Sequence, residues 1–168
     1  ASYDASTGLL TVTGSHFVHA SGAVNDVDIS TLILTGEDGV TYTLTSAVDI
    51  DISSATQFSV TLAGMDQTHV KGLLNKDGSS ADDGTNYNLA VTDNWMLAAA
   101  SASDIADATS TITVSNVIAP SINSVTYDAS TGVMLITGSH FSSLSGAGND
   151  VDVSNITLKG EAGASHTL

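Results

Sequence analysis

Most of the chain alternates apolar and polar residues with a period of two, the pattern of strands that bury one face. Valine, isoleucine and leucine fill the apolar positions, and threonine and serine fill many of the polar ones. The alternation predicts strands over 9–13, 32–34, 42–44, 48–52, 58–62, 87–91 and 112–114. Gly-Glu-Asp-Gly at 36–39 is a good hairpin turn between the second and third of them. About seven short strands at this spacing are typical of a β-sandwich.

Two segments depart from the alternation. Between 65 and 76 the apolar residues recur at helical spacing, and Gly78 follows in a helix stop signal, so a short helical insert is expected there. A second short helix is expected over 94–100, with Trp95 as its anchor in the core. Residues 79–85 are polar and predict a loop.

The beginning of the chain recurs near its end. Residues 1–44 align with residues 125–168 without a gap, at an offset of about 124 residues, and more than half of the aligned positions are identical. Such identity marks an internal repeat. Pro120, the only proline, lies just before the second copy and is interpreted as part of a joint. We therefore expect one unit over 1–118, with its opening strand partly missing, and the first third of a second unit over 119–168.

The shortened second copy has a physical consequence. Its three or so strands cannot close a sandwich, so an apolar face and an open edge would remain. Two explanations stay open. Either these residues belong to a longer repetitive polypeptide, or a neighbouring molecule completes the half-domain by strand addition, which would make the chain a protomer of a self-assembling fibre.

Residues 119–125, followed by 133–141, resemble the opening of an IPT/TIG-type immunoglobulin-like domain, in which a P-x-I-x-S-V strand precedes an L-x-I-x-G-x-x-F strand. The full unit, with its NDVD(I/V)S and GLLNKDG segments, also resembles tandem repeats of giant secreted bacterial adhesins and surface-layer-like proteins. The resemblance implies an all-β fold of immunoglobulin-like sandwich repeats, located at the bacterial surface or in the extracellular matrix. Residues 65–95 are an insert relative to a minimal domain of this family.

The charge balance narrows the choice of partners. Three lysines, no arginine and 18 acidic residues give a net charge of −15. Such a surface repels phosphate, which makes nucleic acids and anionic lipids poor partners and cations good ones. With 42% hydrophobic residues, the chain is too apolar to be an acidic disordered tail. No stretch approaches the roughly 18 apolar residues of a membrane span, and any export signal would lie outside these residues.

The clearest candidate for a metal site is Asn-Asp-Val-Asp at 25–28, which recurs at 149–152. Carboxylate and amide oxygens are the ligands that Ca²⁺ prefers, and in an extended segment Asp26 and Asp28 would point to one side while Val27 and Ile29 point inward. The alternative is that these acids solvate a strand and cap the preceding turn. The candidate ligands are Asn25, Asp26, Asp28, Asn149, Asp150 and Asp152.

Other acidic clusters are weaker candidates for cation sites. They are Asp82 with Asp83 in a loop, Asp104 with Asp107 near the expected joint, and Asp49 with Asp51. Calcium at a joint would stiffen a string of domains, whereas the alternative for each cluster is a plain solvated surface.

Histidine and cysteine give little support to catalysis. Cysteine is absent, which excludes disulfides and thiolate metal sites. His16 and His140 are equivalent in the two copies, but His19 is replaced by Ser143, and His69 stands alone. No GxSxG, HExxH or Walker motif occurs, so the chain is not expected to be an enzyme.

Two functions from different classes remain. The first is a structural repeat module of an extracellular surface, fibre or matrix protein, stiffened by divalent cations and joined to copies of itself or to adjacent repeats. The alternative is a module of a repeat adhesin that binds a glycan or a cell-surface protein through loops at a domain end.

Overall fold

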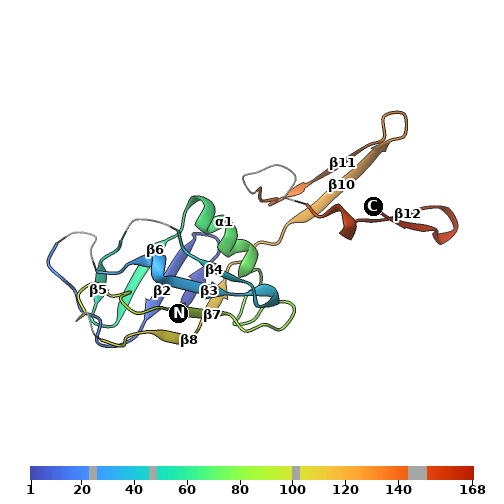
Figure 1. Ribbon diagram of the computed structural model, residues 1–168. Helices are drawn as coiled ribbons and strands as arrows, with labels where there is room; N and C mark the ends of the chain where they lie inside the picture. Colours follow the sequence, from blue (N-terminus) through green and yellow to red (C-terminus); the bar gives the residue numbers. More distant parts are fainter. Residues whose placement is uncertain (23–25, 46–48, 100–102, 144–150) are drawn as a thin grey trace. The chain divides into compact units, whose positions relative to one another are not determined.

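In a computed structural model, the described residues (1–22, 26–45, 49–99, 103–143 and 151–168) form two compact units (Figure 1). The first unit is Ala1–Ala119 and the second is Pro120–Leu168. Both are built mainly from β-strands, which confirms the expected all-β class. Among these residues no helix has the length and apolar character needed to cross a membrane.

The first unit contains two sheets. The larger has the strand order β5-β6-β2-β1-β9, with all neighbours antiparallel except β1 and β9, which run parallel. The smaller has the order β4-β3-β7-β8 and is antiparallel throughout. The strands are β1 (Ser2–Asp4), β2 (Leu9–Thr13), β3 (Leu32–Thr35), β4 (Thr41–Thr43), β5 (Ile52–Ser54), β6 (Gln57–Thr61), β7 (Asn88–Val91), β8 (Asp107–Thr111) and β9 (Thr113–Ser115).

One hydrophobic core lies between the two sheets and gives a sandwich-like arrangement. Leu10 and Phe58 of the larger sheet and Leu34 and Leu89 of the smaller sheet are all buried in the same cluster. The predicted strand 112–114 is part of a longer extended segment. Its first part, β8, pairs with β7 of the smaller sheet, and its last part, β9, pairs with β1 of the larger sheet. Ile112, which is fully buried, lies between β8 and β9.

The predicted helix is present as α1 (Gly64–Leu73). Its buried residues Val70 and Leu73, and Leu74 at its end, join the core, as the helical spacing of apolar residues indicated. The helix ends beside the β3–β4 turn, where the carbonyl of Leu73 lies against the α-carbon of Gly36. A side chain at position 36 would collide with that carbonyl.

Two local predictions need correction. Residues 94–99 do not form a helix, because Asn94 has a φ of +68° and the backbone is used in pairing: Met96 bridges Val27, and Leu97 N–H donates to the Asp26 carbonyl. Trp95 is nevertheless buried, as expected. Of the strand expected over 48–52, residue 48 lies outside the described residues. Residues 49–51 contain only an isolated bridge at Ile50, and strand β5 begins at Ile52.

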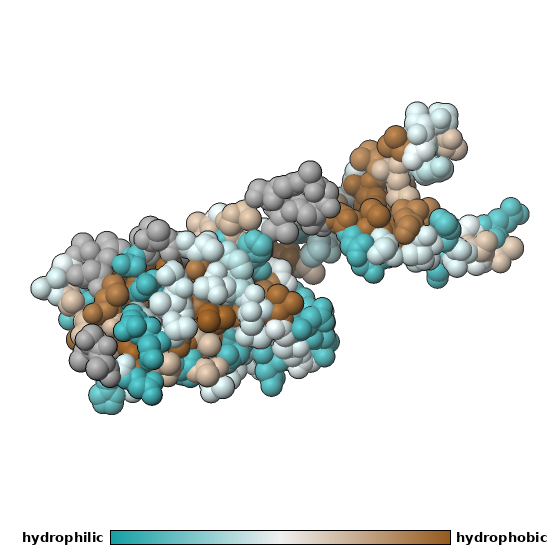
Figure 2. Space-filling model, viewed as in Figure 1, coloured by the Kyte–Doolittle hydropathy of each residue, from teal (hydrophilic) through white to brown (hydrophobic). Residues whose placement is uncertain are grey.

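The second unit consists of two hairpins. The first pairs β10 (Ser121–Asp128) with β11 (Val133–Ser139), and the second pairs β12 (Thr157–Lys159) with β13 (Ser165–Thr167). Apolar side chains remain exposed on this unit, visible as brown atoms in Figure 2. The largest exposures among them are those of Ile122, Tyr127, Val133, Leu135 and Val151.

Many aligned positions of the two copies have the same local conformation. Tyr3 pairs with Leu10 as Tyr127 pairs with Met134. His16 and His140 both have a φ of +61°. The environments differ, however: Val27 is fully buried, whereas its counterpart Val151 is 64% exposed.

Candidate functional site

Three carboxylates meet at one end of the first unit. Glu37 and Asp38 lie in the short 3₁₀ turn η2 (Glu37–Gly39) between β3 and β4, and Asp83 lies in the loop before β7. One ligand oxygen from each falls within 4.8 Å of the others. Hard oxygen donors at this spacing can hold part of the shell of a divalent cation such as Ca²⁺.

Hydrogen bonds fix this cluster, which we call the turn cluster (Glu37, Asp38 and Asp83). Asp38 N–H donates to Asp83 Oδ2 at 2.9 Å, and Thr85 donates to Asp83 through both its hydroxyl, at 2.6 Å, and its N–H, at 2.8 Å. Asn75 Nδ2 donates to Glu37 Oε2 at 2.8 Å. The Thr85 hydroxyl, followed by the backbone donors, holds the pKa of Asp83 below its usual value, so this carboxylate stays charged at neutral pH.

Asp26, the central residue of the predicted calcium motif, is not on the surface. Its carboxylate is fully buried and accepts hydrogen bonds from Ala20 N–H at 2.7 Å, Ile52 N–H at 2.8 Å and His19 Nδ1 at 2.7 Å. The expectation that Asp26 and Asp28 share an outward face is therefore wrong. The buried Ile52 N–H and the half-buried Ala20 N–H need an acceptor, and Asp26 supplies it.

Asp28 and its counterpart Asp152 act as caps in the structure. Each accepts from the N–H and hydroxyl of the serine two residues later, at the start of a 3₁₀ turn. The turns are η1 (Ile29–Thr31) and η3 (Val153–Asn155). The alternative to calcium binding had these acids cap the preceding turn, but the turn that Asp28 and Asp152 cap is the one that follows them. Val27 and Ile29 point inward as predicted. Asn25, Asn149 and Asp150 lie outside the described residues.

The weaker acidic candidates are spread over different places. Asp82 forms an exposed ion pair with Lys76 at 3.3 Å, next to the turn cluster. Asp104 is exposed, and Asp107 at the start of β8 accepts from Thr109 N–H and the Ser110 hydroxyl. Asp51 is exposed and Asp49 half-buried. Of the predicted ligands that the structure describes, only Asp83 belongs to the turn cluster.

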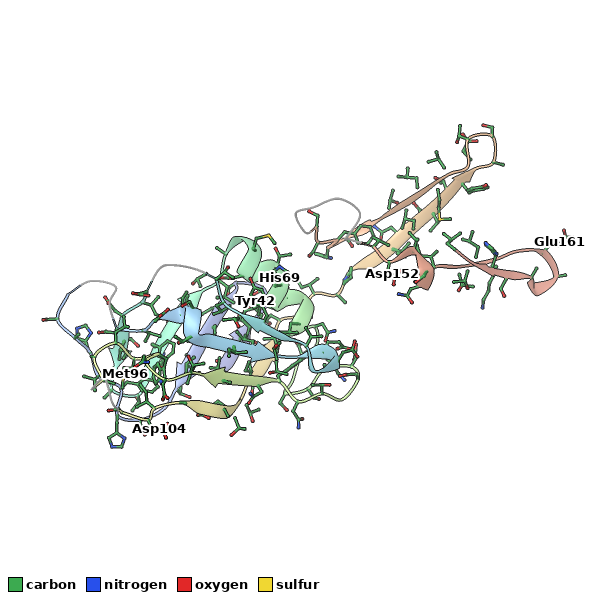
Figure 3. All side chains as sticks on the ribbon, in the orientation of Figure 1. Tyr42, His69, Met96, Asp104, Asp152 and Glu161 are labelled. Atoms are coloured by element: carbon green, nitrogen blue, oxygen red, sulfur yellow. The ribbon has the colours of Figure 1, made fainter. Side chains whose placement is uncertain are left out.

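A second polar group is buried under α1. Asp66 accepts from the Tyr42 hydroxyl at 2.7 Å and from the N–H and hydroxyl of Thr45, and His69 stacks on Tyr42 with 4.6 Å between ring centroids (Figure 3). Burial, and then the bond to Asp66, raise the pKa of Tyr42. These contacts give His69 a packing role.

Sequence reasoning treated Glu37 and Asp38 only as turn residues. Their partner Asp83 is 45 residues from Asp38 along the chain, a separation at which no spacing rule operates. The only local signal was the pair of acids in the turn itself. The second copy carries Ala162 at the position of Asp38, so the turn cluster is not a repeated feature.

Comparisons with family models, with curated proteins and with solved structures found no match to this chain.

Proposed function

We propose that this chain is a structural repeat module of an extracellular bacterial surface, fibre or matrix protein, in which immunoglobulin-like sandwiches follow one another in tandem. The observation that carries the proposal is the agreement between the two copies. Two hairpins, the aspartate cap and the left-handed residues recur at aligned positions although their surroundings differ.

The strand order of the first unit supports the immunoglobulin-like part of the proposal. Labelled A to G along the chain, β5-β6-β2-β1 corresponds to the order D-E-B-A, and β4-β3-β7-β8 corresponds to C′-C-F-G. Helix α1 occupies the E–F connection.

The short connection between the units supports a tandem array. Only residues 116–120 separate the last strand of the first unit, β9, from the first strand of the second, β10. A linker this short restricts how far neighbouring units can rotate, and stability in such arrays is the sum of local terms and neighbour contacts.

The proposal predicts that residues 45–119 can complete the second unit. In a chain that carries a second copy of these residues after Leu168, amides of β11 and β12 should exchange at least about a hundredfold more slowly than in the 168-residue chain, because they enter a cooperative sandwich. Hydrogen exchange read by mass spectrometry measures this. A control with Phe58→Asp in the appended copy should restore fast exchange. Unchanged exchange in the first fusion would contradict the proposal.

Cation stiffening is the second component, supported by the net charge of −15 and by the turn cluster. Extracellular calcium modules bind with dissociation constants of about 10⁻⁴–10⁻³ M, so about 10 mM Ca²⁺ should raise the melting temperature of the first unit by roughly 5 °C relative to EDTA at equal ionic strength. The variant with Glu37→Gln, Asp38→Asn and Asp83→Asn should lose this response, and Asp104→Asn should keep it. Identical melting of the parent chain in both buffers would refute cation stiffening.

A further inference from the structure

A groove of about 280 Å³ opens in the first unit between its two sheets. Four consecutive residues, Val12 to Ser15, form one wall, and parts of β7 and β8 form the other. The volume lies below the range of about 300–1,000 Å³ that is usual for small-molecule sites, and it suits a few protein side chains better than a ligand.

The lining of the groove includes three aromatic side chains. They are Phe17, Phe58 and Trp95, with ring centroids 5.4 Å apart for Phe17 and Trp95 and 5.8 Å apart for Phe58 and Trp95. The Trp95 indole N–H donates to the Ile105 carbonyl at 2.9 Å, which fixes the ring. An aliphatic side chain placed here would bury apolar surface without leaving a polar group unpaired.

The wall formed by β2 has an unused backbone edge. Val12 and Thr13 pair with Phe58 and Gln57 of β6 on one side. On the other side β1 pairs with β2 only as far as Thr11, and among the described residues no strand continues beyond it. A free strand edge bordering an apolar groove is the geometry used in strand addition.

In the second unit, strand β10 occupies the edge that corresponds to this free edge of β2. Residues 136–139, which align with Val12 to Ser15, pair antiparallel with Val125, Ser124, Ile122 and Ser121 of β10. Ile122 lies opposite Gly138, the counterpart of Gly14. The four residues that form the wall of the groove are therefore the four whose counterparts hold the first half of β10.

We infer that the groove of the first unit is the seat of a β-strand with the pattern of Ser121–Ser124, joined to Ala1 on its amino side, with an aliphatic side chain at the position of Ile122 entering the groove among its aromatic side chains. Ser2 is already paired with Thr11, and the same register puts Ala1 opposite Val12. A strand that enters Ala1 in the same direction therefore runs antiparallel along Thr13 to Ser15. The inference rests on the proposed function, because a tandem array supplies such a strand in front of each unit.

The test adds Pro-Ser-Ile-Asn-Ser, the sequence of residues 120–124, directly before Ala1 of the full chain. Burial of one isoleucine and new ladder hydrogen bonds should raise the melting temperature of the first unit by about 5–10 °C. Trp95 is the only tryptophan, so its fluorescence reports on the groove, and its quenching by acrylamide should fall. A control prefix carries aspartate in place of the isoleucine and should produce neither change.

Three outcomes would overturn the inference: no effect of the isoleucine prefix, equal effects of both prefixes, or an effect of the free peptide Pro-Ser-Ile-Asn-Ser without an effect of the attached prefix. The readouts concern only the first unit. Failure of the appended 45–119 segment to complete the second unit therefore leaves this test interpretable, and the two failures can be told apart.

Discussion

Gly36→Ala should destabilise the first unit by roughly 3 kcal/mol and lower its melting temperature by about 10 °C. A β-carbon at this position would collide with the Leu73 carbonyl and approach Leu73 Cγ to 2.8 Å. The carbonyl belongs to the backbone of α1 and cannot move away as a flexible side chain could. To accept alanine, the helix must shift and disturb the packing of Leu73 and Leu74. Denaturant unfolding followed by Trp95 fluorescence measures the loss.

Gly72→Ala is the matched control for this substitution. Gly72 lies on the exposed side of the same helix, and a β-carbon there meets nothing within 4 Å. Because alanine favours a helix over glycine, this change should stabilise the unit by up to about 1 kcal/mol. Alanine at Gly36, which faces the end of α1, and alanine at Gly72, within α1, should thus act in opposite directions. Equal effects would show that Leu73 does not confine position 36.

Gly160, the counterpart of Gly36 in the second unit, gives an independent comparison. Its added β-carbon would find only the Ala164 carbonyl, at 3.9 Å. Neither Gly36, with a φ of −148°, nor Gly160, with a φ of −110°, has the positive φ that favours glycine, so the conformation of the turn does not by itself explain the glycine. At position 36 the close approach of α1 does.

Local patterns predicted the elements of this fold well. Alternation located β2 and β6 within a residue, the acidic turn located the β3–β4 hairpin, and helical spacing located α1. Each of these signals lies within a few residues of chain, where side-chain periodicity reflects which face is buried.

The failures all involve partners that are distant along the chain. Residues 94–99 contain apolar residues suited to a helix, but pairing with 26–28 claims their backbone. Asp26 was expected at the surface because a lone acid usually lies there, yet donors from Ala20 and Ile52 hold it inside. The turn cluster and the groove likewise depend on how separate segments meet, which composition and spacing do not encode.

Asp26→Ala should be the most damaging single substitution, with a loss of about 3–5 kcal/mol, since it removes the acceptor of the buried Ile52 N–H and of the half-buried Ala20 N–H. It also removes the partner of His19, whose side chain is half-exposed. Total stabilities of about 5–15 kcal/mol mean that this variant stands close to unfolding. Asp26→Asn has nearly the same shape and retains one acceptor oxygen, so it should fold with a smaller loss. Urea unfolding at pH 7 compares the two variants with the parent chain.

The fall in stability at low pH, which we call the acid limb, separates the effect of the charge of Asp26 from the effect of its shape. Burial alone would raise the pKa of this carboxyl, but the hydrogen bonds from Ala20, Ile52 and His19 outweigh it and hold the pKa below its usual value. A depressed folded pKa means that the stabilisation is present above the unfolded value of about 3.9 and is lost as the pH falls through the folded value. Asp26→Asn has no carboxylate to protonate at this position, so the free energy of unfolding of this variant should fall less steeply below about pH 4.

Surface repulsion acts in the opposite direction, because protonation of exposed acids relieves the net charge of −15 as the pH falls. Asp104→Asn removes one charge from the exposed surface and controls for this effect. If only the buried hydrogen-bonded carboxylate governs the acid limb, Asp104→Asn should keep the slope of the parent chain while Asp26→Asn flattens it. If stability falls equally steeply with pH in the parent chain and in Asp26→Asn, the pKa of Asp26 is the same in the folded and the unfolded chain, and the prediction is wrong.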